Sequence, residues 1–177
     1  MLRRRGLLGL GLGGFVAGCG FQPVYMSAGH GEQSVAQREL AAVTVNIIPD
    51  RPGQLLRQAL QERLERGATG VAQLYNLNVG YGIAGEGIAI QQDSNTTRIR
   101  LVARASWFLN AQDPARTQLA TGSARAFDAY NNFNEQYFAS DQENDAAAVR
   151  LAGAVADQIV IQLAAYFRHR AAATATG

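Results

Sequence analysis

The sequence has very little of the chemistry on which most enzymes depend. Cys19 is its only cysteine, His30 and His169 are its only histidines, and every one of its 16 basic residues is arginine. A single cysteine excludes an internal disulfide. The sequence contains no His-x-x-His, His-Glu-x-x-His or Cys-x-x-Cys spacing that would indicate a transition-metal site. Neither a phosphate-binding glycine loop nor a Gly-x-Ser-x-Gly elbow is present. We therefore expect a protein that is not an enzyme, with no catalytic residues, no metal and no cofactor.

Paired carboxylates keep one enzymatic alternative open, a lipid-anchored hydrolase. Asp128 with Glu135, or Glu143 with Asp145, are the candidate pairs. The second pair follows the start of a predicted helix, where acidic side chains interact favourably with the helix dipole. Since the histidines lie near the two ends of the chain, we favour the structural interpretation of these acids.

Residues 1–18 have the parts of an export signal. Arg3 to Arg5 precede an uncharged run from Gly6 to Val16, which is shorter than the about 20 apolar residues of a membrane-spanning helix. The run ends in Val16-Ala17-Gly18-Cys19, which resembles the lipobox of bacterial lipoproteins: an aliphatic residue, two small residues and the cysteine that receives the lipid. We predict a lipoprotein signal peptide over 1–18, cleavage before Cys19, and acylation of Cys19 with chains such as palmitate. The general and twin-arginine export routes both stay open.

The predicted mature protein is close to electrically neutral. Removal of residues 1–18 leaves 159 of the 177 residues and takes away Arg3 to Arg5, so the formal net charge falls from +2 to −1. This length suits a single domain with one core. A nucleic-acid-binding domain would carry a concentrated basic surface, so we expect no nucleic-acid partner.

Beyond Cys19, the periodicity of apolar residues predicts four strands and two helices. The polar residues 19–39 are expected to form a lipidated tether, and the Ala/Thr-rich residues 169–177 a disordered tail. Alternation predicts strands over 40–48, 72–83, 96–109 and 118–130, with a loop or loose hairpin over 85–95. Apolar stripes predict helices over 54–66 and from a Ser140-x-x-Glu143 capping box to 168.

This element order predicts an α+β fold for residues 40–168. Three strands with short connections form an antiparallel meander, and the first strand and its helix must pack on the same sheet to bury their apolar faces. The expected architecture is a two-layer sandwich, with two helices packed on one face of a four-stranded, mainly antiparallel sheet.

The strand over 96–109 has the clearest alternation. Trp107 is expected in the core, together with Leu101, Leu77, Val45, Leu60 and Val155. Arg98, Arg100 and Arg104 point to the opposite face, where alternate residues lie about 6.6 Å apart. Judged from the residues alone, the three arginines favour the solvated polar face of a half-buried sheet, and a polar or anionic binding partner is the alternative.

The chain resembles the LptE family of lipopolysaccharide-assembly lipoproteins. The resemblance rests on Gly18-Cys19-Gly20-Phe21-Gln22-Pro23, on the order of elements over residues 38–168, and on the Asn-rich aromatic stretch before the last helix. It implies an outer-membrane lipoprotein of Gram-negative bacteria, facing the periplasm. Such a protein plugs the lipopolysaccharide-export β-barrel LptD, supports its assembly and contributes to lipopolysaccharide transport.

The resemblance also implies contact with lipopolysaccharide through basic residues. On this chain the candidates are Arg98, Arg100 and Arg104, because a guanidinium binds phosphate and carboxylate groups in a bidentate way. Gly20 after the cysteine favours sorting to the outer membrane. The alternative is a lipid-anchored auxiliary subunit of another envelope lipid transporter, which would share the lipobox and the α+β domain but bind a different partner.

Overall fold

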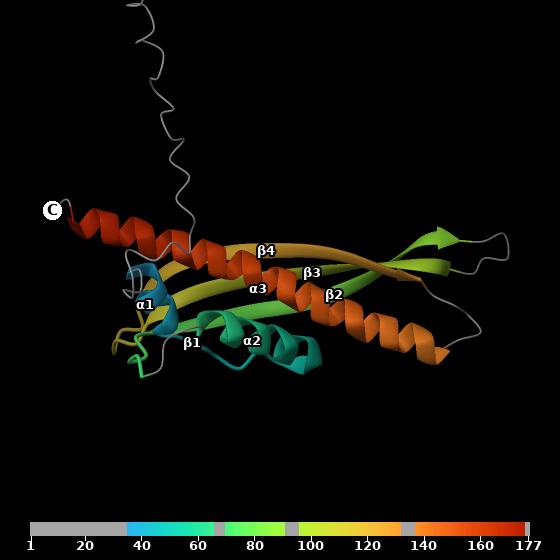
Figure 1. Cartoon of the computed structure of the whole chain (residues 1–177), viewed down its shortest axis with the longest axis horizontal. Coiled ribbons are helices and arrows are strands. Elements are labelled where there is room, and N and C mark those ends of the chain that lie inside the picture. The colour runs from blue at the N-terminus through green and yellow to red at the C-terminus, as the bar shows by residue number, and fades with distance from the viewer. Residues whose placement is uncertain (1–34, 66–69, 91–95, 132–136, 176–177) are drawn as a thin grey trace, which may run out of the picture.

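The computed structural model describes residues 35–65, 70–90, 96–131 and 137–175. Their elements are α1 (Val35–Ala41), β1 (Val43–Val45), α2 (Asp50–Leu64), β2 (Tyr75–Ile90), β3 (Thr96–Ala111), β4 (Gln118–Asn131) and α3 (Tyr137–Ala175). Figure 1 shows an elongated molecule in which α3 runs lengthwise along three long strands. The predicted signal peptide, Cys19 and His30 lie outside the described residues, as does most of the predicted tether.

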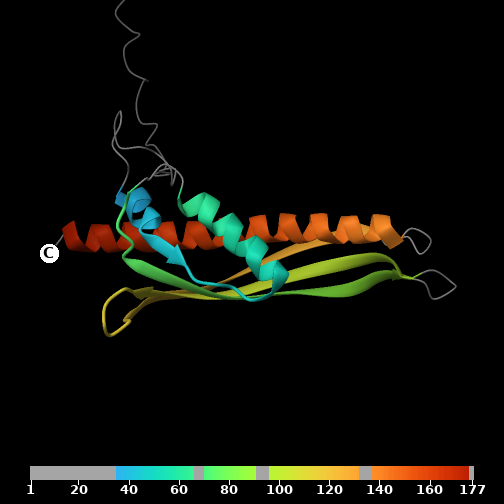
Figure 2. The same ribbon diagram turned by 90° about the horizontal axis from the view of Figure 1, so that it is seen from below.

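The strands form one sheet in the order β1-β2-β3-β4. β1 pairs with β2 in parallel, whereas β2 with β3 and β3 with β4 are antiparallel. Viewed from below, the helices occupy one layer and the sheet the other (Figure 2). The α+β fold is confirmed. The detail differs in that three helices, not two, lie in the described part of the chain.

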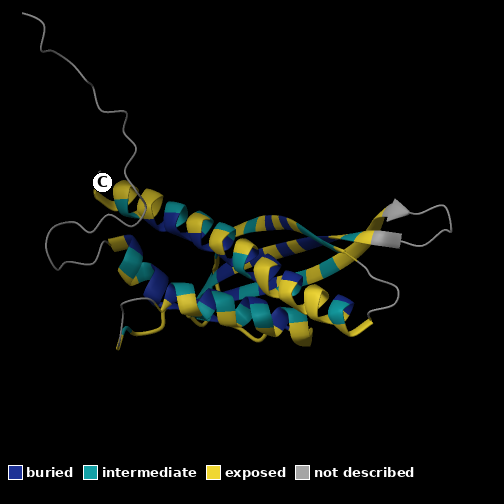
Figure 3. Cartoon of the chain, turned by 45° about the vertical axis from the view of Figure 1, so that its right-hand side comes forward, coloured by how far each residue is buried: buried dark blue, intermediate teal, exposed yellow. Residues whose placement is uncertain are grey.

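The core lies between the sheet and the helices (Figure 3). On β3, Leu101, Ala103, Ala105, Trp107 and Leu109 are all buried and face the helices. Trp107 also donates a hydrogen bond from Nε1 to Oε1 of Gln162 on α3, at 3.0 Å. The predicted core residues, including Trp107, are confirmed as members of one buried cluster.

Helix α2 buries the leucine stripe that the sequence predicts. Leu56, Leu60 and Leu64 are at most 2% exposed. The helix begins at Asp50 rather than at residue 54, because Pro52 is compatible with the first turn of a helix, where its missing N–H is not needed. A Cβ atom on Gly53 would lie 2.7 Å from Cγ2 of Ile48, so glycine allows the incoming chain to pack tightly against the helix.

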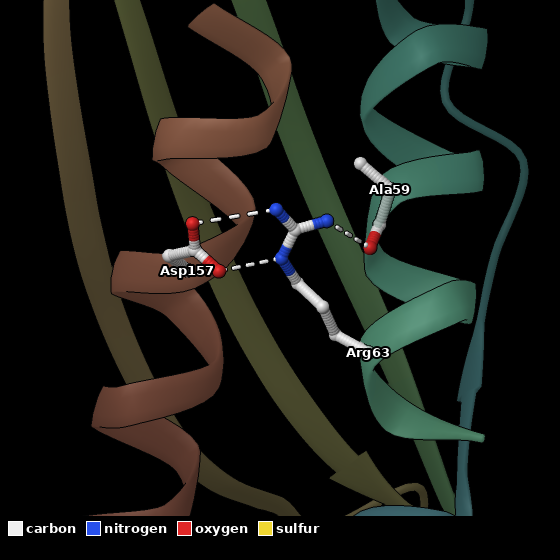
Figure 4. A network of polar contacts seen from close by, with 3 residues as sticks. All are labelled: Ala59, Arg63 and Asp157. Carbon is white, nitrogen blue, oxygen red and sulfur yellow. Dashed lines mark hydrogen bonds and ion pairs between the residues drawn. The ribbon is translucent and has the colours of Figure 1, made fainter. Parts of the chain in front are cut away.

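One guanidinium joins α2 to α3 (Figure 4). Arg63 donates from Nε and Nη2 to the carboxylate of Asp157, at 2.6 and 3.3 Å, and from Nη1 to the carbonyl of Ala59, at 2.9 Å. The side chain of Arg63 is only 20% exposed. Because one guanidinium bonds to groups of both helices, it fixes them side by side.

The first strand is shorter than the sequence predicts. Its ladder covers only Val43–Val45, and one further bond runs from the amide of Asn46 to the carbonyl of Leu77, at 3.0 Å. Beyond it the alternation fails, since Ile47 is 85% exposed while Ile48 is buried. The chain leaves the sheet here because Ile48 packs beneath Gly53 at the start of α2.

The second strand is longer than predicted. β2 continues through the glycine-rich residues 85–90, which the sequence analysis assigned to a loop or loose hairpin, and pairs with β3 as far as Ile90. Register shifts occur between Gly87 and Ala89 and between Ala89 and Ile90. Glycines have no side chains to pack against neighbouring strands, so this part of β2 depends on its hydrogen bonds to β3.

Both ends of the predicted domain need correction. Residues from Val35 belong to α1, not to the tether, and bury Ala36, Leu40 and Ala41. At the other end, α3 begins at Tyr137 rather than at the predicted capping box, and it continues to Ala175 through residues expected to be disordered.

Arg170 gives a reason for the longer helix. It donates to the hydroxyl of Tyr75, which in turn donates to Glu39 on α1, at 3.2 and 2.6 Å. The last turns of α3 are therefore connected to β2 and α1. Helix α3 is also long and apolar enough to cross a membrane, but its apolar stripe is buried in the core of this fold.

Helix α3 also covers the outer edge of β4. Gln158 accepts from the amide of Arg125 and donates to its carbonyl, at 3.2 and 3.0 Å, and Gln162 donates to the carbonyl of Ser123, at 2.9 Å. Asp128 accepts from the amide of Ala129 at 2.7 Å. Side chains thus occupy backbone groups that would otherwise be available to another strand.

Candidate functional site

The sheet face opposite the helices, here called the open face, carries the candidate binding residues. Arg98, Arg100 and Arg104 of β3 are exposed, and they lie opposite the core-facing residues of the same strand. The open face also presents two aromatic side chains: Phe108 and Phe127 are 43% and 57% exposed. Val102, opposite Phe127 in the strand register, is buried. The face therefore combines positive charge with aromatic surface.

Arg100 already has an anionic partner. Its Nη2 lies 2.7 Å from Oε2 of Glu86 on β2, directly across the ladder, and both side chains are 48% exposed. The hydrogen bond and charge of Arg100 lower the pKa of Glu86, and Arg104 and Arg125 contribute smaller electrostatic effects in the same direction. Of the three predicted arginines, Arg100 is thus the one whose charge is partly compensated.

Arg104 lies beside a second arginine that the sequence analysis did not select. The strand register places Arg125 of β4 directly opposite Arg104, and like charges in this arrangement repel each other. The guanidinium of Arg125 lies 4.5 Å from the ring centroid of Phe127, a favourable cation–π distance. Within the described ranges neither guanidinium forms a salt bridge to a carboxylate.

A shallow hollow of about 390 Å³ lies between these two arginines and β2. Its lining includes Gly80, Gly82, Ser106 and Ser123. A Cβ atom on Gly82 would have nothing within 4 Å, so the glycine leaves space beside Arg104. Two guanidinium groups with two hydroxyl donors around a hollow form a suitable site for a multiply charged anion such as a phosphate group.

The other end of the open face is rich in amides and carries a single arginine, Arg116, in its lining. Asn46 donates to Asn78 at 2.7 Å, and Gln112 donates to Asn76 at 3.2 Å. Together with Phe108 and Arg116, asparagines of β2 and β3 line a second hollow of about 410 Å³. This end offers hydrogen bonds but little charge, which suits contact with a polar protein surface.

The carboxylates considered for hydrolysis have structural partners. Asp128 accepts from Arg150 at 2.7 Å, and Asp145 accepts from Arg51 at 2.8 Å. Glu143 lies on α3 close in sequence to Asp145, and Glu135 lies outside the described residues. No cluster of three metal-ligating side chains occurs in the parts of the chain that the structure describes.

Comparison with known proteins gives a family match and a fold match. The model of the family LptE, described as lipopolysaccharide-assembly, matches residues 40–163, which is more than half of the chain. No curated protein matches the chain.

Two solved structures share the fold. A candidate lipoprotein from Caulobacter crescentus superposes with a TM-score of 0.60 at 19% identity, covering 75% of this chain and 96% of its own. The rare lipoprotein B from Shewanella oneidensis superposes with a TM-score of 0.50 at 12% identity, covering 70% of this chain and 92% of its own. At these identities the likeness establishes the fold and leaves the binding residues to be argued from this chain.

Proposed function

The chain belongs to the LptE family of lipopolysaccharide-assembly proteins, and on that premise we propose that it is an outer-membrane lipoprotein, acylated on Cys19, that plugs the lipopolysaccharide-export barrel LptD. In this role it supports assembly of the barrel, contributes to lipopolysaccharide transport and has no enzymatic activity. The observation that carries the proposal is the family match over residues 40–163, which spans nearly the whole folded domain.

The two-layer architecture supports a plug. The helices cover one face of the sheet, while the open face keeps its arginines, asparagines and serines available. The lumen of a large outer-membrane barrel is polar, and the arginines, asparagines and serines of this face can contact it through hydrogen bonds. Lipid chains on Cys19 would hold the protein at the membrane, and more than one chain is needed for stable anchoring.

The partner is tested by affinity purification from native membranes. The full chain, carrying a C-terminal tag, is captured in mild detergent, and the captured protein is examined for LptD by immunoblotting with and without heating. A large heat-modifiable barrel is expected with the wild type, and a much smaller amount with Cys19→Ala, which should leave an uncleaved or missorted precursor. Capture of an inner-membrane lipid transporter without the barrel would favour the alternative of an auxiliary transporter subunit.

We also propose that lipopolysaccharide binds directly to Arg98, Arg100 and Arg104, with Arg125 beside them. Isolated exposed contacts between arginine and phosphate are weak and screened by salt. Several such contacts to one multiply charged head group reinforce one another. Because Arg104 and Arg125 have no carboxylate partner among the described residues, we expect them to contribute more than Arg100.

Three variants of the purified protein separate these contributions. The triple variant with Arg98, Arg100 and Arg104 changed to Gln, and the double variant Arg104→Gln with Arg125→Gln, should bind lipopolysaccharide more weakly than the wild type. Arg51→Gln with Arg168→Gln removes two exposed helical arginines and is the matched control. Wild-type affinity should fall as salt rises. Equal binding by the double variant and the control would show that the open face is not the lipopolysaccharide site.

A further inference from the structure

The outer edge of β2 is unpaired over most of its length. β1 pairs with β2 only over Tyr75–Leu77, yet β2 continues to Ile90. The carbonyl of Leu77 accepts from Asn46 and therefore points away from β3. Since the polar groups of successive strand residues point in opposite directions, every second residue beyond Leu77 presents its N–H and C=O outward. These residues are Val79, Tyr81, Ile83, Gly85 and Gly87.

Apart from Glu86, whose charge is paired with Arg100 on the open face, the unpaired stretch lacks the usual protections of a strand edge. Natural edge strands are blocked by proline, lysine, bulges or covering side chains, and β4 is covered in this way by Gln158 and Gln162 of α3. On β2 the register with β3 is continuous from Tyr75 to Gly87, and the shifts come only after it. Within the described residues no hydrogen bond reaches the outward groups of Val79 to Gly87.

A cavity of about 700 Å³ borders the same edge on the helix side of the sheet. Ile83, Ile99 and Leu101 contribute apolar lining, and Leu55 and Ala148 contribute from α2 and α3. The ion pair of Arg51 with Asp145 forms a polar side of the same cavity. Gly85 and Gly87 of β2 also line the cavity and have no side chains to fill it. Figures 1 and 2 show why space exists here, since β2 continues past the N-terminal end of α2.

We propose that the edge of β2 from Val79 to Gly87 binds an extended segment of a partner protein, which joins the sheet as an additional strand and inserts alternate apolar side chains into the cavity. The main-chain hydrogen bonds would supply affinity, and the cavity would select the side chains. This combination of a free edge with a neighbouring pocket is a general mode of peptide recognition. The proposal does not depend on the identity of the barrel or on the lipopolysaccharide site, because it uses the backbone edge of β2 and a cavity on the helix side of the sheet, whereas the arginines project from the open face.

An extended peptide matches both the unpaired edge and the cavity, whereas an acyl chain or a second copy of the chain matches only one of them. An acyl chain could enter the cavity but has no groups to bond with the outward amides and carbonyls of β2. A second copy of β2 could pair with the edge, but Val79, Tyr81 and Ile83 on its own helix side already pack against its own core. It would thus have little apolar side chain left to place in the cavity of its neighbour.

The probe is a displayed library of peptides of about ten residues, long enough to span the edge. Threonine alternates with a varied position, and the library is selected on the full-length chain purified in detergent. We expect selected peptides to carry apolar residues at the varied positions. On binding, the exchange of the amides of Tyr81, Ile83 and Gly85 should slow, whereas those of Gly80 and Gly82, which already face β3, should not change.

Matched variants separate strand addition from simple apolar binding. Gly85→Pro removes an outward N–H without breaking the ladder to β3, and Ala148→Phe fills the cavity; each should weaken peptide binding by at least about tenfold. Gly82→Ala is the control, because the amide of Gly82 faces β3 and its Cβ, on the open face, would meet nothing within 4 Å. Should Gly85→Pro fail to fold, peptides N-methylated on the amides facing β2, compared with those methylated on the opposite amides, give the same discrimination.

Several results would overturn the proposal. One is a library that yields no binder, and another is binding that is indifferent to both Gly85→Pro and N-methylation. Displacement of the peptide by laurate together with that indifference would identify the cavity as a lipid pocket. Slowed exchange of the same amides in a concentration-dependent dimer without peptide would assign the edge to a second copy of the chain.

Discussion

The two faces of the sheet are built from the same strands but use opposite chemistry. On the helix face, Trp107, Leu101 and Leu109 are buried against α2 and α3. The alternate residues of β3, which face the open side, include Arg100, Arg104 and Ser106, and all three are exposed. The alternation of a strand thus lets one segment contribute to stability with one half of its side chains and to binding with the other half. Substitutions on the two faces should therefore affect different properties.

The largest difference is expected between Trp107 and its neighbour Phe108. Trp107→Ala removes a buried ring and its hydrogen bond to Gln162, so the free energy of unfolding should fall by about 3–5 kcal/mol. Phe108→Ala, on the open face, should lower it by about 1 kcal/mol or less. Urea unfolding followed by circular dichroism measures both. Equal losses would mean that the open face contributes to the core as much as the helix face.

A second contrast concerns two glycines that lie on different faces. A Cβ atom on Gly122 would lie 2.6 Å from Cζ2 of Trp107, whereas one on Gly82 would meet nothing within 4 Å. Gly122→Ala should therefore destabilise the fold by about 1–3 kcal/mol through overpacking. Gly82→Ala should leave stability unchanged or slightly raised, because alanine loses less backbone entropy on folding. Thermal melts of the two variants are a direct test, and a similar melting temperature for both would contradict it.

The hydroxyl of Tyr81 gives a third prediction for the helix face. It is buried without a hydrogen-bond partner among the described residues, and burial raises the pKa of Tyr81 to about 12. Removing an unsatisfied buried group should stabilise the fold, so Tyr81→Phe should raise the free energy of unfolding by about 1 kcal/mol.

The same substitution should alter the alkaline limit of stability. The raised pKa means that the unfolded chain releases the phenol proton first, so stability falls as pH rises from 10.0 towards 12. Tyr81→Phe should lack this part of the loss. Urea titrations at neutral and alkaline pH in both proteins measure the difference, and parallel losses would exclude Tyr81 as the source.

The smallest effect is expected at the ion pair of the open face. Arg100 lowers the pKa of Glu86 from its usual value of 4.5, so the pair is present above that value and is lost as pH falls through the lowered pKa. Arg100→Gln should return the carboxyl pKa of Glu86 towards 4.5, with little change in stability because the pair is exposed. NMR titration of Glu86 reports the shift. Arg98→Gln is the control, and an equal shift in that variant would contradict the assignment to Arg100.

The sequence predicted the parts of the fold in which periodicity reflects burial. The alternation of β3 and the leucine stripe of α2 identified the core side correctly, because each apolar side chain there packs against the other layer. The face of Arg98, Arg100 and Arg104 followed from the same alternation. What these residues bind remains a prediction.

The errors come from features that depend on tertiary contacts. The glycine-rich end of β2 is typical of a loop, yet pairing with Ile99 and Leu101 keeps it in the sheet. Arg125 was not combined with Arg104, because the register between two strands cannot be deduced from either strand alone. The last turns of α3 likewise depend on the contact of Arg170 with Tyr75, which has no counterpart in local composition.

The glutamines that cover β4 have a consequence for the order of events in biogenesis. Because α3 follows the three long strands in the sequence, β2, β3 and β4 emerge during synthesis before Gln158 and Gln162 can reach the edge of β4. During that interval the nascent sheet offers two uncovered edges to other chains, the condition in which strands aggregate. A chain terminated before Gln158 would keep that condition permanently. The C-terminal helix thus sets the moment at which the edge of β4 is closed to other chains, while the edge of β2 stays open.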